Sequence, residues 1–263
     1  MRVHALSRSR SAMAALAVCA GAIGAPAIAH AADLGVPAAT ERMCDYGYYN
    51  GFYVGGNVGY LDHMTRRTDS DALLGEAASL VADEGNVSAG VEGGYNWQFH
   101  CTVAGFVADW QWADADASGQ LLPNTPAVAS FSSNMQWYST VRARAGIMVD
   151  QTLLYGTAGI AIADIKDTWT VGPPDVAPTF TSSFSNTRVG LAVGGGLEYA
   201  LSTNVSLKAE ALYLLFTDTT NTIAVPPALG LNPANLATIR GADSAVVARA
   251  GIDIKLGSWL AAK

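Results

Sequence analysis

The sequence predicts an all-β fold, specifically an eight-stranded antiparallel up-and-down transmembrane β-barrel. Eight segments alternate apolar and polar residues, and the connections between them alternate between very short and long. Only 14% of the residues are charged, against about 25% in soluble proteins. After residue 31, no stretch has the roughly 18 consecutive apolar residues that indicate a membrane-spanning helix. A closed barrel is therefore the membrane architecture that fits this chain.

The first 31 residues have the features of a secretory signal peptide. A start that contains three arginines precedes an apolar stretch, and Ala29-His30-Ala31 supplies the small residues that signal peptidase recognises. We therefore predict cleavage between Ala31 and Ala32. A retained anchor helix is the alternative, which the shortness of the stretch disfavours. The predicted domains are a signal peptide at 1–31, a periplasmic N-terminal segment at 32–50, an outer-membrane barrel at 51–259 and a C-terminal overhang at 260–263.

The connections give the predicted barrel a direction. Outer-membrane barrels have short periplasmic turns and long extracellular loops. Here the connections after the second, fourth and sixth segments are short, and the other four are long. The predicted strands are about 51–60, 86–99, 103–112, 136–149, 151–163, 187–200, 204–217 and 244–257. The predicted extracellular loops are 61–85, 113–135, 164–186 and 218–243.

Residue parity within the segments predicts which face meets lipid. In the fourth segment, Val141 and Ile147 share one face while Arg142 and Arg144 share the other. The polar faces consist largely of glycine and charged residues, which suits a narrow lumen better than a solvent-facing surface. Aromatic residues such as Trp110 fall on the apolar face, as expected for the aromatic belts at the membrane interfaces.

The charged residues on the predicted inner face form the main candidate site. Six are basic and five are acidic, although the whole chain has a formal net charge of −7. Side chains just fill an eight-stranded barrel, and buried charges need partners. We therefore predict a plug of salt bridges, with a gated ion path as the alternative. The predicted lumen residues are Glu92, Asp109, Arg142, Arg144, Arg188, Glu198, Lys208, Glu210, Arg249, Asp253 and Lys255.

We predict no catalytic residues, no metal site and no cofactor. Two histidines would remain after cleavage: His63 in the first long loop, where we expect it to be solvated, and His100 in a periplasmic turn. They would lie at opposite ends of the barrel and could not act together in acid–base chemistry. Phosphate-binding loops, zinc-ligand spacings and nucleophile elbows are absent from the sequence. The acidic balance also disfavours nucleic acid as a partner.

Several strand motifs resemble the porin-opacity type outer-membrane proteins of proteobacteria, which are OmpA-like eight-stranded barrels. The resemblance covers nearly all of the mature chain. One departure is the C-terminus, where Trp259 is followed by four residues instead of ending the chain. Either Trp259 serves as the terminal aromatic with a short overhang, in which case deletion of these four residues should be harmless, or assembly is less efficient. The motifs are Ala32-Asp33, Gly51-Phe52-Tyr53-Val54-Gly55-Gly56-Asn57-Val58-Gly59-Tyr60, Val91-Glu92-Gly93-Gly94-Tyr95-Asn96-Trp97-Gln98, Val141-Arg142-Ala143-Arg144-Ala145-Gly146 and Val247-Ala248-Arg249-Ala250-Gly251.

The resemblance implies a bacterial outer-membrane protein that supports the envelope and displays surface loops. The expected partners are outer-membrane lipid and lipopolysaccharide, the barrel assembly machinery, and host or surface ligands bound through the four loops. The alternatives are a small diffusion porin and a surface receptor for a ligand such as haem. No residue of a family binding site is matched in this sequence.

Two cysteines outside the signal peptide give a testable prediction. Cys44 precedes the first strand and Cys101 lies in the turn after the second, so the topology brings both to the periplasmic end. Because the periplasm is oxidising, we predict a Cys44–Cys101 disulfide. Denatured mature protein should react with a thiol reagent only after reduction, as mass spectrometry would show. Two reactive thiols before reduction would contradict the disulfide.

Overall fold

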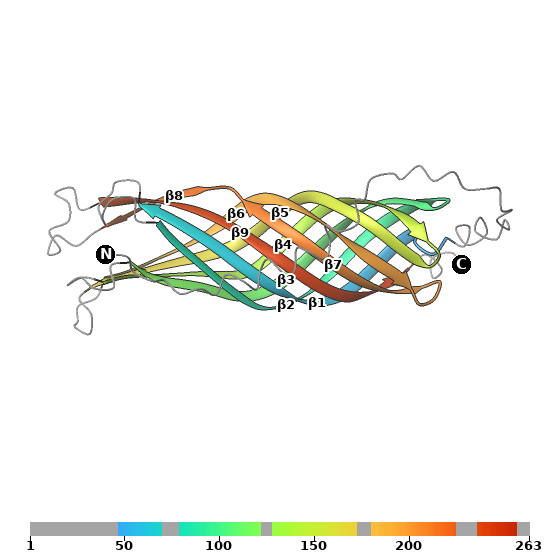
Figure 1. Cartoon of the computed structure of the whole chain (residues 1–263), viewed down its shortest axis with the longest axis horizontal. Helices are drawn as coiled ribbons and strands as arrows, with labels where there is room; N and C mark the ends of the chain where they lie inside the picture. The colour runs from blue at the N-terminus through green and yellow to red at the C-terminus, as the bar shows by residue number, and fades with distance from the viewer. Residues whose placement is uncertain (1–46, 70–78, 122–127, 173–179, 225–235, 257–263) are drawn as a thin grey trace, which may run out of the picture. The chain divides into compact units, whose positions relative to one another are not determined.

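A computed structural model of the chain describes residues 47–69, 79–121, 128–172, 180–224 and 236–256. The predicted signal peptide, Cys44 and Trp259 lie outside these residues. Every regular element in the described residues is a β-strand, and the strands wind obliquely around one barrel (Figure 1). Helices long and apolar enough to cross a membrane are absent from the described part of the chain.

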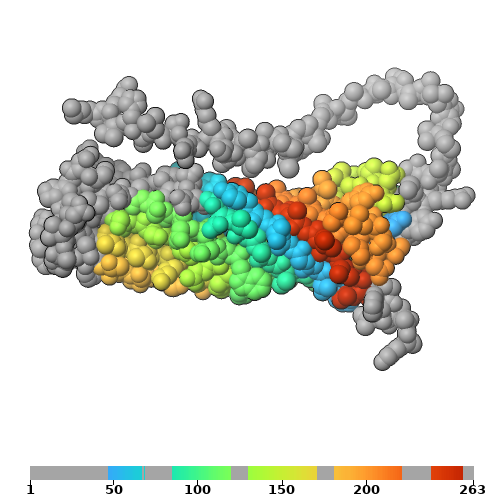
Figure 2. Space-filling view, turned by 90° about the horizontal axis from the view of Figure 1, so that it is seen from below, coloured from blue at the N-terminus to red at the C-terminus, as the bar shows by residue number. Residues whose placement is uncertain are grey.

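The strands form one closed antiparallel sheet. Each strand from β1 to β6 pairs with the next, β7 pairs with β9, and β9 pairs with β1. Figure 2 shows β9 (red) lying along β1 (blue) on the barrel surface. The strands are β1 (Gly51–Asp69), β2 (Ser79–Phe99), β3 (Thr102–Leu121), β4 (Val128–Val149), β5 (Thr152–Gly172), β6 (Phe180–Ala200), β7 (Val205–Phe216), β8 (Thr219–Ala224) and β9 (Leu236–Lys255).

The predicted eight-stranded barrel is confirmed, with one of its strands interrupted. Strand β8 follows β7 after two residues and pairs with β9 above the β7–β9 ladder, so β7 and β8 together form the seventh strand. Up to the pairs Ser88–Ala113 and Gly190–Phe216, where the described β2–β3 and β6–β7 ladders end, closure gives each strand a hydrogen-bonded neighbour on both sides. Beyond that level β8 pairs with β9 alone. In a bilayer, closure is what satisfies backbone groups that water cannot reach.

The short turns lie where the sequence places them. His100 and Asp150 have φ values of 55° and 56° in the turns after β2 and β4. This left-handed conformation costs least for glycine, and Asp and His adopt it more readily than most other residues. Tight turns therefore form without glycine at these two positions.

The predicted lengths of the long loops were wrong, because most residues of these four ranges belong to strands. Strand β3 continues to Leu121 and β4 begins at Val128, within the predicted loop 113–135. The other three predicted loops are likewise entered by strands from both sides. Several strands are 20 residues or longer, about twice the 9–11 residues that a transmembrane strand needs. The barrel therefore has a second part beyond the membrane.

The two parts differ in which face is apolar. In β5, the outward residues Leu154, Ile160 and Ile162 are exposed and apolar, whereas the next two outward positions are Asp164 and Lys166. The inward residue Ile165 is fully buried. We call the first part the membrane band (51–61, 87–99, 102–112, 137–149, 152–163, 188–200, 205–216 and 245–255). The second part is the extension (62–69, 79–86, 114–121, 128–136, 164–172, 180–187, 219–224 and 236–244).

A β-bulge in β4 lies at the boundary between the two parts. Met135 and Tyr138 are both fully buried although they are three residues apart, and the pairing register shifts between Met135 and Trp137. The additional residue reverses the parity of the strand, as bulges do. Apolar side chains in the extension therefore still point inward after β4 leaves the membrane band.

Arginine substitutions should distinguish the two parts of the barrel. Val193 lies midway along the outward face of β6 in the membrane band, and Ser183 lies on the same strand in the extension. An arginine at the bilayer midplane costs about 2–4 kcal/mol. Val193→Arg should lower the unfolding free energy by about this amount in liposomes, as urea titration would measure. Ser183→Arg should change the unfolding free energy little. Equal losses of unfolding free energy in the two variants would show that the membrane band has been assigned to the wrong residues.

Candidate functional site

Four charged side chains meet at the centre of the lumen. Arg142 from β4 donates to Asp109 from β3, with 2.9 Å between Nη2 and Oδ2. It also donates to Glu210 from β7, with 2.8 Å between Nη1 and Oε1. Arg249 from β9 contacts the same two carboxylates at 3.1 and 2.6 Å. All four side chains are almost completely buried, and together they connect four strands of the barrel, β3, β4, β7 and β9.

A second ion pair lies nearer the end of the barrel where the short turns are. Arg144 donates to Glu198 at 2.5 Å, and Ser206 donates to the other Glu198 oxygen at 2.6 Å. The Arg144 guanidinium lies 4.3 Å from the centre of the Tyr155 ring and donates to the Tyr53 hydroxyl at 3.2 Å. Cation–π contacts of this kind stabilise most when the cation is desolvated, as here.

A lysine joins these groups to the remaining lumen acids. Lys208 pairs with Glu92 and lies 3.7 Å from Asp253, and Glu92 lies 3.7 Å from Arg249. Seven of the charged residues thus form one connected set of ion pairs across the barrel. The Arg144–Glu198 pair joins that set through Tyr155, which donates to Glu210 at 3.2 Å. We call the set together with this pair the central cluster: Glu92, Asp109, Arg142, Arg144, Glu198, Lys208, Glu210, Arg249 and Asp253.

Inward glycines make room for the central cluster. A Cβ atom at Gly196 would lie 2.8 Å from the Tyr155 hydroxyl, and one at Gly159 would lie 2.9 Å from Cγ of Arg142. A Cβ at Gly94 would lie 2.6 Å from the Tyr53 hydroxyl. Side chains larger than hydrogen would displace the groups that position the arginines. The glycines on the predicted lumen face therefore belong to the charged site.

The mouth of the barrel at the short-turn end is closed by aromatic and aliphatic side chains. Tyr49, which precedes β1, is buried, and its hydroxyl lies 2.8 and 2.7 Å from the backbone oxygens of Gln151 and Glu198, so it can donate to either one. Burial, and secondarily the Glu198 carboxylate, raises the pKa of Tyr49 well above its ordinary value. Its neutral hydroxyl thus remains a donor. The buried cluster at this mouth consists of Tyr49, Val103, Met148, Leu153, Tyr155 and Ala200.

Lys255 is the predicted lumen residue that lies outside the charge network. Its side chain is only partly buried and donates to the backbone oxygens of Gly47 and Tyr48 at 2.8 and 3.4 Å. It therefore attaches the segment before β1 to the end of β9. The other ten predicted lumen residues are buried.

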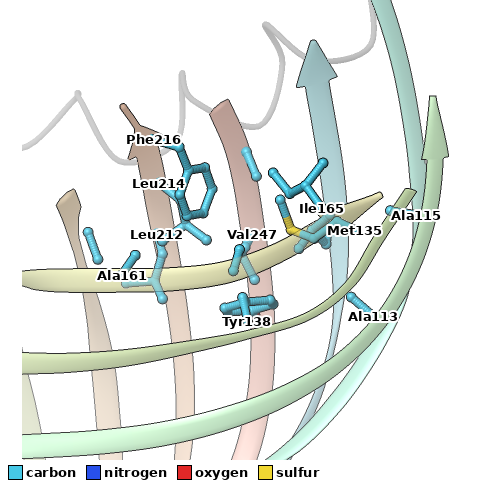
Figure 3. Packing of buried hydrophobic residues seen from close by; sticks show 14 residues of the cluster. Ala113, Ala115, Met135, Tyr138, Ala161, Ile165, Leu212, Leu214, Phe216 and Val247 are labelled. Atoms are coloured by element: carbon cyan, nitrogen blue, oxygen red, sulfur yellow. The ribbon is translucent and has the colours of Figure 1, made fainter. Parts of the chain in front are cut away.

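An apolar layer lies directly above the central cluster. Along β9, Arg249 is followed on the inward face by Val247 and Ala245, and on β7 the residue after Glu210 on this face is Leu212. Figure 3 shows side chains of this layer, among them Val247 and Leu212, pointing into the barrel from several strands. The apolar layer consists of Leu61, Ala113, Ala115, Met135, Tyr138, Ala161, Ala163, Ile165, Ala192, Leu212, Leu214, Phe216, Ala245 and Val247.

A second group of charges, the outer cluster, lies above the apolar layer. It consists of His63, Asp167, Arg188 and Asp243. Arg188 donates to Asp167 at 2.8 Å and also pairs with Asp243, while His63 Nε2 lies 3.3 Å from Asp243. Ser133 donates to Asp167 at 2.8 Å. Arg188 is thus separated from the other predicted lumen residues.

The sequence prediction missed three members of the outer cluster. Asp167 and Asp243 fall within ranges that were assigned to loops, and His63 was expected to be solvated. That expectation was wrong, because the His63 side chain is fully buried. The inward parity of β1 and β9, continued past the membrane band, is the signal that could have identified His63 and Asp243.

The charged groups of the lumen are held in fixed positions. The central acids are bound by arginine or lysine side chains that are themselves buried. Groups of three or more metal-ligating side chains do not occur among the residues that the structure describes. The His63–Asp243 pair has no exposed side-chain surface. The lumen therefore combines fixed charges with tightly packed apolar groups.

A β-barrel with an apolar outer band and a charge-filled lumen defines the class of outer-membrane barrel proteins. A family model described as an outer membrane protein beta-barrel domain matches residues 15–230. The chain therefore belongs to the outer-membrane β-barrel family, and its location is the bacterial outer membrane.

Similar proteins come from several bacteria. The 31 kDa outer-membrane immunogenic protein of Brucella melitensis is 31% identical over 183 residues, which are 67% of this chain and 75% of that protein. A 22 kDa outer membrane protein of Rhizobium leguminosarum bv. viciae is 32% identical over 120 residues, 46% of this chain and 48% of its own length. The outer membrane protein OprG of Pseudomonas aeruginosa has a TM-score of 0.50 at 16% identity, covering 80% of this chain and 99% of OprG, and supports the fold alone.

Removal of one central carboxylate should destabilise the barrel strongly. Glu210→Ala leaves Arg142 and Arg249 buried with fewer counter-charges, and breaking such a pair costs about 3–5 kcal/mol. The unfolding free energy in detergent or liposomes should fall accordingly. Asp116→Ala, at an exposed position on β3, is the control and should have a small effect. Similar values for both variants would show that the central cluster does not stabilise the fold.

Proposed function

We propose that the protein is a non-enzymatic structural barrel of the outer membrane that supports the envelope and presents its extracellular part to the surroundings, with a lumen closed to ions. The observation that supports this best is the layered lumen, in which the central cluster and the outer cluster are separated by the apolar layer. A path through the barrel would have to pass both kinds of layer.

The central cluster opposes opening because its side chains are almost completely buried, so bulk solvent does not reach a charge that loses its partner. Arg142 and Arg249 each contact both Asp109 and Glu210, so moving either arginine breaks more than one ion pair. Separating buried charges costs several kcal/mol. The cluster therefore favours one closed arrangement of the lumen.

The apolar layer provides an independent barrier to ions. Leu212, Leu214 and Phe216 project from β7 toward Met135 and Tyr138 of β4 within one packed cluster (Figure 3). Hydrophobic constrictions in channels stop ions by excluding water. This barrier persists even where a salt bridge below it is lost, which argues against the small diffusion porin as the principal function.

Planar-bilayer recording tests the closed lumen. Pure wild-type protein should show no steady single-channel conductance. Leu212→Ala combined with Leu214→Ala should admit small ions, because both truncations thin the apolar layer. The outward Leu207→Ala with Leu215→Ala on the same strand is the matched control and should remain silent. Steady conductance from the wild-type protein would overturn the proposal and favour the diffusion porin.

A further inference from the structure

The outer surface of the extension carries ordered rows of hydroxyl groups. Antiparallel pairing places Ser118 of β3 opposite Ser132 of β4, Ser132 opposite Thr168 of β5, and Thr168 opposite Ser183 of β6. These four residues form one row across four strands. A second, shorter row lies beyond it, where Ser130, Thr170 and Thr181 are paired in the same way. We call the two rows the hydroxyl surface.

The hydroxyl surface retains hydrogen-bonding capacity. Thr168 and Ser183 are 3.2 Å apart, and Thr170 and Thr181 are 3.3 Å apart. Each hydroxyl can donate one hydrogen bond and accept two, so one contact to a neighbour leaves further capacity. All of these side chains are exposed or partly exposed. The surface thus offers both donors and acceptors without net charge.

A hollow lies within the hydroxyl surface. Its volume is about 400 Å³, and Ser118, Ser130, Ser132, Thr168 and Thr170 line it together with Gly119 and Phe131. This volume lies within the range of small-molecule sites, roughly 300–1,000 Å³. A hollow lined by neutral hydroxyls on a sheet that spaces its strands about 4.8 Å apart suits a ligand whose own groups are closely spaced hydroxyls.

The height of the hydroxyl surface above the membrane narrows the choice of ligand. Trp112 and Trp137 are paired at the outer end of the membrane band, and Trp137 stacks on Trp110. Ser118 is six residues beyond Trp112 on β3, about 20 Å along the strand. With a strand tilt near 40°, the row lies roughly 15 Å above the aromatic residues. At this level the outer leaflet presents the sugars that its lipids carry.

The charged residues between the hydroxyl surface and the membrane favour a neutral sugar over a phosphate as the ligand. The row nearest the membrane joins Asp116, Asn134, Lys166 and Ser185, and Asn134 donates to both Asp114 and Asp116 at 2.8 Å. One lysine against two carboxylates does not favour an anion. Neutral saccharide hydroxyls fit the rows above this level better than phosphate does.

The opposite wall of the extension has a different surface. On β1 the outward positions beyond the membrane band are Asp62, Met64, Arg66 and Thr68, which form no hydroxyl row. Among the side chains that the structure describes, the rows of three or more paired hydroxyls therefore lie on β3 to β6 and not on β1.

We propose that the hydroxyl surface binds the saccharide of lipopolysaccharide molecules packed against the barrel. Such a ligand is continuous with the lipid that covers the membrane band directly below. Because its acyl chains hold it beside the protein, its sugars are present at high effective concentration, and a few hydrogen bonds suffice for binding. The proposal does not depend on whether the lumen conducts.

Native mass spectrometry of the folded full chain can test the proposal. The protein is released from mixed micelles that contain lipopolysaccharide with its complete core sugars or lipid A without them. Wild-type protein should retain the complete form more strongly. Ser132→Ala combined with Thr168→Ala should reduce retention of the complete form by roughly fivefold or more, to the level of lipid A, because net hydrogen bonds are lost.

A matched control and two further outcomes keep the test decisive. Thr220→Ala with Ser244→Ala removes two hydroxyls from β8 and β9 and should leave retention unchanged. Equal retention of lipid A and the complete form by the wild type would overturn the proposal, as would equal losses in both variants. Equally tight binding of free core oligosaccharide would also overturn it, in favour of a soluble glycan. Heat-modifiable gel migration would verify that each variant is folded.

Discussion

The sharing of two carboxylates by two buried arginines is the interaction on which the rest of the barrel depends. Arg142 and Arg249 reach Asp109 and Glu210 from opposite walls, so the strand number and the register must bring β3, β4, β7 and β9 to the correct separation. Eight strands enclose a space that side chains can fill. Inward glycines then become necessary, because the guanidinium groups and the tyrosines beside them occupy the volume that larger side chains would need.

Much of this arrangement could be predicted from the sequence because it follows from parity. The side-chain period of a strand is two, so once Val141 faces lipid, Arg142 must face the lumen. Burial then requires partners of opposite charge, and the acids on the same face supply them. What parity alone could not supply was which acid meets which arginine. That choice depends on strand register across the barrel, where residues distant in sequence such as Asp109 and Arg249 become neighbours.

The extension was not predicted because the polar and apolar faces exchange sides at its base. In β5 the alternation continues without interruption into the extension. There the polar residues point outward, and the apolar Ala163 and Ile165 point into the interior. Reduced apolar content and many serines and threonines are also typical of loops. His63 and Asp243 were misplaced for this reason. Unbroken alternation was the better guide to these segments, because strand geometry imposes it whichever face is apolar.

The polar exterior of the extension has a consequence for how the barrel enters and leaves the bilayer. Asp114, Asp116, Asp164 and Lys166 lie on the outer face beyond the membrane band, so each must traverse hydrocarbon during insertion from the periplasm. Every charged crossing raises the activation barrier, by up to about 2–4 kcal/mol for lysine at the midplane. Unassisted insertion would accordingly be slow. Extraction faces the same barrier in reverse, so the inserted barrel is retained kinetically as well as by its equilibrium stability.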